Sequence, residues 1–146
     1  MTHVLNGGCH CGALHLTFET PHAPAELPLR ICTCSFCVKQ GARYTADKDG
    51  RATFTAASSD LLHRYQFGTK TADILSCARC GTYVAAVTTV EGKLYAAINV
   101  NALDDQAAFA RAPDVTNFSD QTPEQRGERR QSNWTPATLD FAAAAR

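Results

Sequence analysis

Short segments in which apolar and polar residues alternate dominate the first part of the chain. Within residues 13–18 every second side chain is apolar, and Ala52, Phe54 and Ala56 repeat the pattern after an Asp-Gly turn. Alternation with a period of two places the apolar side chains on one face of a strand. These segments therefore predict β-strands with one buried face, as in an antiparallel sheet.

The clearest hairpin comprises residues 82–90 and 93–100. A Glu-Gly pair joins the two segments, and glycine readily takes the positive φ that such a two-residue turn requires. Two further strands are expected at residues 61–67 and 73–76, on either side of a Gly-Thr turn, and residues 35–40 could form one helical turn. The pattern as a whole predicts a mainly β fold, with α+β character at its margins.

The composition changes after this hairpin. Residues 103–113 suggest a short helix that ends at a proline, residues 114–136 are polar and weakly periodic, and residues 138–146 are rich in alanine. We expect this tail to add little to the core. Its two large aromatic residues, Phe118 and Trp134, could still dock the tail onto the sheet or over an open site, or could simply pack.

Length and charge exclude several classes of protein. A chain of 146 residues has the size of one ordinary domain. Its 14 basic residues balance its 14 acidic residues, so nothing predicts binding to nucleic acid or to an anionic membrane. No segment approaches the roughly 20 apolar residues that span a bilayer. The N-terminal sequence also has no apolar export signal, so we expect a soluble, cytoplasmic protein.

Seven cysteines in three tight clusters carry the candidate chemistry. Their spacing divides naturally into four ligands plus three. Zinc held by four thiolates is a closed structural site, whereas zinc held by three protein ligands keeps a position for water or substrate. We therefore expect two zinc ions per chain. The clusters are Cys9 and Cys11, then Cys32, Cys34 and Cys37, then Cys77 and Cys80.

The order of the strands indicates which cysteines share a metal. The first pair enters the first strand and the last pair enters the late hairpin, so one zinc shared by these two pairs would clamp two ends of the sheet together. The middle three lie on a separate loop, where C-x-C-x-x-C can place three sulfurs on one metal at about 2.3 Å. A histidine such as His10 or His63 would close that second site and make it inert, but spacing supports neither.

Other uses of cysteine stay open at this stage. Disulfides are disfavoured by the odd number of cysteines and by the expected reducing compartment. A thioredoxin-type use of Cys77 and Cys80 would require a βαβ setting, which the surrounding sequence does not predict. An iron–sulfur cluster also takes four cysteines, and spacing alone does not exclude it. Zinc is favoured because C-x-x-C-G is the form of a zinc knuckle, with Gly81 in the turn.

Three sequence motifs, taken in order, resemble one known family. The chain contains GCHCG from residue 8, CTCSFCVKQG from residue 32 and CARCG from residue 77. This order resembles the glutathione-dependent formaldehyde-activating enzyme family, which includes centromere protein V. The resemblance covers roughly residues 7–101 and implies a tent of antiparallel sheets pinned by zinc. It also implies a domain over residues 1–146, with a zinc-binding β core at 7–101 and a C-terminal extension at 102–146.

The resemblance also implies roles for the cysteines and an activity. Cys9, Cys11, Cys77 and Cys80 match the ligands of the family's structural zinc. The other three match the ligands of its catalytic or labile zinc, so the candidate catalytic residues are Cys32, Cys34 and Cys37. The implied activity is that of a carbon–sulfur lyase, in which glutathione and formaldehyde combine to S-(hydroxymethyl)glutathione. A small thiol and a small aldehyde are therefore the expected partners.

Two points remain open in this interpretation. Lys39, Arg43, Lys70 and Arg79 could neutralise the open site or meet substrate carboxylates, and Tyr44 and Tyr65 could donate hydroxyl groups. The tail contains no recognisable glutathione-binding element, so the thiol and the aldehyde are not identified. The alternative function is a non-catalytic, zinc-stabilised binding module that senses thiols or metal.

Overall fold

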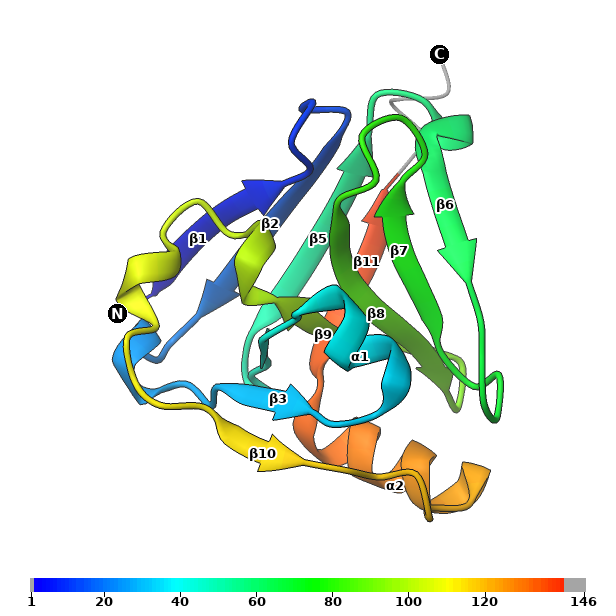
Figure 1. Cartoon of the computed structure of the whole chain (residues 1–146). Helices are drawn as coiled ribbons and strands as arrows, with labels where there is room; N and C mark the ends of the chain where they lie inside the picture. The colour runs from blue at the N-terminus through cyan, green and yellow to red at the C-terminus, as the bar shows by residue number, and fades with distance from the viewer. Residues whose placement is uncertain (1, 141–146) are drawn as a thin grey trace.

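The computed structural model describes residues 2–140 and is mainly β, as the alternating segments predict. Eleven strands form one hydrogen-bonded network, which folds into two sheets that lean together like a tent (Figure 1). In the first sheet the order is β1, β2, β5 and β11. These strands are β1 (His3–Gly8), β2 (Leu14–Thr20), β5 (Arg51–Ala56) and β11 (Thr135–Asp140).

The second sheet is built around β9, which pairs with β8 and β4. On one side of β9 the order continues through β8, β7 and β6, and on the other through β4, β3 and β10. The strands are β3 (Arg30–Cys32), β4 (Tyr44–Thr45), β6 (Leu62–Tyr65), β7 (Asp73–Cys77), β8 (Tyr83–Val90), β9 (Lys93–Asn99) and β10 (Asp114–Thr116).

The last strand, β11, joins the two sheets. Thr135 and Pro136 pair with β9, and the next four residues pair with β5. Thr135 is fully buried, and its Oγ1 accepts a hydrogen bond from the backbone N–H of Asp47 at 2.7 Å. The expectation that the tail adds little to the core is therefore wrong, because this strand closes the angle between the sheets.

The main core lies between the two sheets. On β2 the buried and exposed positions alternate, which places Leu14, Leu16 and Phe18 in the core as predicted. The β8–β9 hairpin is also confirmed, and both residues of its turn, Glu91 and Gly92, have positive φ. This backbone matches the right-handed twist of the paired strands.

Strand β8 is buried on both faces, since a second and smaller core lies on its other side. Tyr83 and Ala86 pack there with Ile74 and Ala42. Partly buried aromatic side chains cover this small core: Phe36, Tyr44 and Trp134. A pocket lies on this aromatic side of the sheet.

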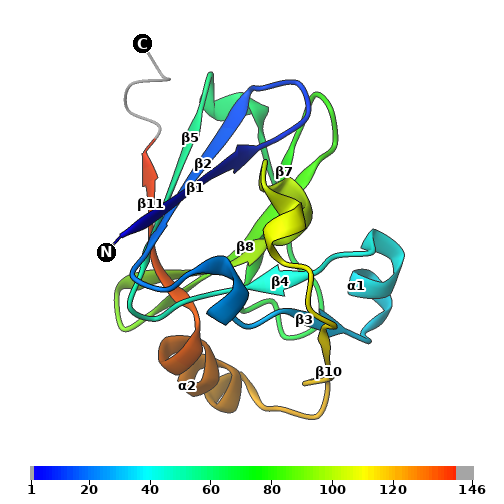
Figure 2. The ribbon, with the colours of Figure 1, turned by 90° about the vertical axis from the view of Figure 1, so that its left-hand side faces the viewer.

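Two α-helices complete the fold, α1 (Ser35–Gln40) and α2 (Pro123–Asn133). Both views place α2 at the end of the molecule where β3 and β10 lie (Figures 1 and 2). Helix α1 was expected, and short helices were expected in the C-terminal part of the chain, although not at the position of α2. Among residues 2–140 no helix is long and apolar enough to cross a membrane. Single 3-10 turns occur at Pro24–Glu26, Ser59–Leu61, Val100–Ala102 and Gln106–Ala108.

Two further details differ from the sequence predictions, and a third prediction lies largely outside the described residues. The helix expected at residues 103–113 is only the 3-10 turn Gln106–Ala108, because the chain turns inward to bury Phe109 in the main core. The sheets are not wholly antiparallel, since β11 runs parallel to β5, and β10 runs parallel to β3. The alanine-rich end predicted at residues 138–146 falls largely on residues 141–146, outside the described part.

Candidate metal centres and pocket

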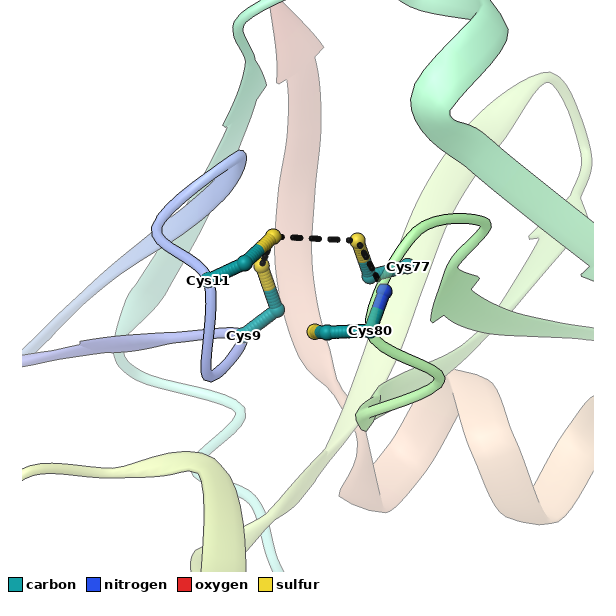
Figure 3. A group of neighbouring side chains, drawn as sticks. All are labelled: Cys9, Cys11, Cys77 and Cys80. Atoms are coloured by element: carbon teal, nitrogen blue, oxygen red, sulfur yellow. Dashed lines mark hydrogen bonds between the residues drawn. The ribbon is translucent and has the colours of Figure 1, made fainter.

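Four cysteines converge where the β1–β2 turn meets the β7–β8 turn. One sulfur atom from each of Cys9, Cys11, Cys77 and Cys80 lies within 4.8 Å of the other three (Figure 3). The Cys11 Sγ is 3.6 Å from both the Cys9 Sγ and the Cys77 Sγ. Zinc–sulfur bonds of about 2.3 Å in a tetrahedron would separate the sulfurs by about 3.8 Å. These four sulfurs are therefore spaced to hold one zinc ion.

The local sequence shapes both turns in the same way. A glycine follows each cysteine pair, and Gly12 and Gly81 have φ values of 83° and 82°, which other residues rarely adopt. In the second turn the backbone N–H groups of Arg79 and Cys80 each donate to the Cys77 Sγ at 3.4 Å. The predicted zinc-knuckle turn at Gly81 is confirmed, with backbone donors aimed at sulfur.

Polar groups and burial shift the pKa values of Cys9, Cys11 and Cys80 in different directions. Hydrogen bonds from the backbone of Ala13 and then from the Arg79 side chain lower the pKa of Cys11. A hydrogen bond from the Thr82 hydroxyl lowers the pKa of Cys80 to about 5. Burial instead raises the pKa of Cys9 to about 11. A metal would hold all four as thiolates, since coordination removes the proton from a thiol.

The other three cysteines surround the start of α1. Cys32 ends β3, Cys34 is the N-cap of α1, and Cys37 lies in its first turn. The three sulfur atoms lie within 4.8 Å of one another. In the described part of the chain no histidine or carboxylate joins this group, and His10 and His63 are not among its members.

Hydrogen bonds also organise this three-cysteine group. The backbone N–H of Cys37 donates to the Cys34 Sγ at 3.4 Å, and the N–H of Cys34 donates to the Cys32 Sγ at 3.5 Å. A hydrogen bond from the Cys37 thiol lowers the pKa of Cys32 to about 5, and the same bond raises the pKa of Cys37. A thiolate is therefore already favoured at Cys32 within this group.

Two tyrosines extend the network away from the sulfurs. The Tyr44 hydroxyl lies 3.1 Å from the Cys37 Sγ and 2.9 Å from the Tyr83 hydroxyl. Burial raises the pKa of both tyrosines well above the usual value, so both keep their protons. The Tyr44 hydroxyl therefore lies beside the sulfurs, and its use as a hydroxyl donor stays a prediction. Tyr65 instead stacks on Phe67, and it does not line the pocket.

The three-cysteine group opens into a pocket of about 540 Å³. Its walls combine aromatic and basic side chains, and the segment after residue 113 supplies many of them. The aromatic residues are Tyr44, Phe67, Tyr83, Phe118 and Trp134, and the basic residues are Arg30, Arg126, Arg129 and Arg130. Phe118 and Trp134 therefore dock the tail over this pocket.

The basic residues named from the sequence are not those of the pocket. Lys39, Arg43, Lys70 and Arg79 do not line it. Arg79 instead donates from Nε to the Cys11 Sγ at 3.4 Å, in the four-cysteine group, and Arg43 donates to the side chain of Asn101. The arginines of α2 were not predicted to line the pocket, because this segment was expected to add little to the core.

The structure describes all seven cysteines, and all are free thiols. Groups of four and three converging thiols on a β scaffold define a mainly β protein whose cysteines could hold zinc, because soft thiolate ligands suit zinc or iron–sulfur clusters. The chain matches the model of the glutathione-dependent formaldehyde-activating enzyme family over residues 4–121. It belongs to this family.

A solved structure is similar in fold. The crystal structure of a Rhodobacter sphaeroides protein aligns with 29% sequence identity and a TM-score of 0.60. The alignment covers 76% of this chain and 99% of that protein. The family match ends before α2 and β11, so the arginines of α2 lie beyond the matched residues.

Proposed function

We propose that the protein is a zinc-dependent carbon–sulfur lyase that joins a small thiol to a small aldehyde, or cleaves the adduct. Glutathione and formaldehyde are the proposed pair, in keeping with the family. The observation that carries this proposal is the three-cysteine group, whose sulfurs face a 540 Å³ pocket without a fourth protein ligand in the described chain. A cytoplasmic location would keep these thiols reduced.

The two cysteine groups would have different roles. Zinc at Cys9, Cys11, Cys77 and Cys80 would be structural, because it would tie the β1–β2 turn to the β7–β8 turn. Zinc bound by the other three thiolates would keep its fourth position for a substrate thiol, held as a thiolate, and would be a weak Lewis acid because the thiolates outweigh its charge.

The reaction forms one carbon–sulfur bond. The thiol sulfur attacks the carbonyl carbon of the aldehyde, the carbon–oxygen π bond breaks, and the proton lost from the thiol ends on the new hydroxyl group. The Tyr44 hydroxyl would position the Cys37 sulfur and offer a donor at the edge of the site. Aromatic walls from Phe67, Phe118 and Trp134 would limit the access of water to the adduct.

Exchange NMR on glutathione with formaldehyde tests this proposal. The zinc-loaded wild type should accelerate the exchange between free glutathione and its hydroxymethyl adduct, whereas Cys34→Ser should not. If a thiol binds but the exchange is not accelerated, only the assignment of glutathione and formaldehyde as the substrates is contradicted. The absence of thiol binding would favour the alternative, a non-catalytic zinc-stabilised module.

A further inference from the structure

Four arginines line the pocket of the three-cysteine group, and we call them the arginine wall. Arg30 lies on β3 two residues before Cys32, and Arg126, Arg129 and Arg130 lie on α2. No acidic residue of the described chain lines this pocket. The wall therefore faces the pocket with several positive charges and no protein carboxylate.

Helix α2 separates its charges onto two faces. Its three arginines are spaced i, i+3 and i+4, so they share one side of the helix. Glu124 and Glu128 are spaced i and i+4 and share another side. Glu128 does not line the pocket but borders a separate shallow hollow, which Arg129 borders as well. Like charges clustered on one helix face destabilise a helix modestly, and a bound anion would relieve that repulsion.

Two of these arginines are held in place by one residue. Arg126 donates from Nε to the backbone carbonyl of Gln121 at 3.1 Å, and Arg129 donates from Nε to the Gln121 Oε1 at 2.9 Å. The Arg129 guanidinium also lies 3.7 Å from the ring centroid of Phe118.

The other ends of these two guanidinium groups are available. Within residues 2–140 the Nη atoms of Arg126 and Arg129 have no hydrogen-bond partner, and neither residue is in an ion pair. A guanidinium fixed at Nε with a free pair of Nη donors matches the two oxygens of a carboxylate.

Arg130 is the most deeply buried member of the wall. Its side chain is 7% exposed, one terminal nitrogen donates to the Thr71 Oγ1 at 2.8 Å, and its Nε has no partner among the described residues. Burial, together with the charges of Arg129 and Arg126, lowers the pKa of Arg130 to about 10. Buried charge without a counter-ion is costly, and an anionic ligand would offset that cost.

We propose that the arginine wall is an oxyanion-binding subsite, so that the pocket selects thiols that carry carboxylates over neutral thiols. The thiol half of this statement rests on the function proposed above, whereas the oxyanion half rests on the arginines alone. A pocket of about 540 Å³ accommodates a peptide-sized thiol, and its size falls in the usual range for small-molecule sites. The subsite comes largely from α2, beyond the family match at residues 4–121.

Calorimetric titration of the zinc-loaded protein with matched ligands separates the two halves. Glutathione has a thiol and two carboxylates, glutathione diethyl ester keeps the thiol and loses the carboxylates, and S-methylglutathione keeps the carboxylates and loses the thiol. The variants are Arg126→Gln and Arg129→Gln. Arg129→Lys preserves the charge, and Arg51→Gln removes an exposed arginine outside the pocket. Thermal melting checks that each variant is folded.

The expected result is that glutathione binds more tightly than its diethyl ester, and that S-methylglutathione still binds to both wild type and Cys34→Ser. Each Arg→Gln change should lower the affinity for glutathione and for S-methylglutathione by about 10-fold or more. This loss corresponds to one charge-assisted hydrogen bond. Arg129→Lys should retain part of the affinity, and Arg51→Gln should have no effect. Added salt should lower the affinity for glutathione more than the affinity for its diethyl ester.

Equal binding of glutathione and its diester, unchanged by the Arg→Gln variants, would overturn the subsite and leave the proposed function standing. Binding of S-methylglutathione as tightly as glutathione, with no contribution from the thiol, would support the subsite and contradict the thiol chemistry. Failure of all three ligands to bind would overturn both.

Discussion

The hydroxyl of Tyr44 lies 3.1 Å from the Sγ of Cys37. The same hydroxyl is hydrogen-bonded to Tyr83, so a short chain of hydroxyl groups leads from the small core to the three-cysteine group. Groups that hydrogen-bond to metal ligands orient those ligands and adjust metal affinity.

Tyr44→Phe should therefore leave the protein folded but lower the metal affinity of the three-cysteine group by about 10-fold. This is the lower end of the usual loss in affinity when a hydrogen-bond partner of a metal ligand is removed. Binding at the four-cysteine group should not change. Competition with a chromogenic chelator measures both affinities. Tyr65→Phe is the matched control, because Tyr65 is exposed and does not contact the cysteines. Equal zinc affinity in the two variants would show that the hydroxyl has no influence on the sulfurs.

The two cysteine groups should contribute unequally to stability. Cys77→Ser should unfold or strongly destabilise the protein, because Cys77 is 1% exposed and the four-cysteine group joins turns that are distant in sequence. A structural zinc contributes folding free energy of order 10 kcal/mol in zinc-finger peptides. Cys34→Ser should stay folded and lose only the exchangeable metal. Similar thermal melting of the two variants would refute this assignment, and a reversed order would exchange the two roles.

The buried hydroxyl of Thr135 should be needed to hold β11 in place. Thr135→Val keeps the shape of the side chain but leaves the buried N–H of Asp47 without its acceptor, so the free energy of unfolding should fall by about 1–3 kcal/mol. Urea unfolding measures the change. Thr138→Val on the same strand removes an exposed hydroxyl and should change stability by less than about 0.5 kcal/mol. A loss of the same size in both variants would mean that the Asp47 contact is not the cause.

The pair of His22 and Asp47 should make stability depend on pH. The hydrogen bond that His22 Nδ1–H donates to the Asp47 Oδ2 at 2.7 Å, and the charge of that carboxylate, raise the pKa of His22. Burial raises the pKa of Asp47, but hydrogen bonds from His22, from Thr20 and from the Asp49 backbone together lower it. The histidine contribution is complete below about pH 6.5 and is lost as pH rises through the folded pKa, while the carboxylate contribution is present above about pH 4 and is lost as pH falls.

His22→Gln should accordingly destabilise the protein more at pH 5.5 than at pH 8.5, as measured by urea unfolding at each pH. His63→Gln, which changes an exposed histidine on β6, should show no such difference. A loss on His22→Gln that is as large at pH 8.5 as at pH 5.5 would show that the protonated histidine is not what stabilises this contact.

Much of the fold follows from local sequence patterns. Strands β2, β5, β8 and β9 each have an alternating or apolar pattern and a turn signal, and all were predicted. Strand β11 was not, because its short pattern is stabilised only by pairing with β5 and β9, which are distant in sequence. Such long-range pairing overrides weak local preference.

Helix α2 carries a local start signal that hydrophobic periodicity does not reveal. It has no apolar stripe, but Thr122 and Gln125 form a capping box with Pro123 at the first helical position, a known helix start. The division of the cysteines into groups of four and three was predictable, because the residues that form the groups and their spacing are visible in the sequence. The arginine wall was not, because nothing in the sequence shows that α2 packs beside the pocket.

The central claim is that the seven cysteines form one closed and one open zinc site. Native mass spectrometry of the protein, with metal analysis before and after a mild chelator, tests it most directly. We expect two zinc ions per chain at first and one afterwards, with the remaining ion retained in Cys34→Ser. A single tightly held zinc in the untreated protein, or iron with visible absorption, would contradict the claim.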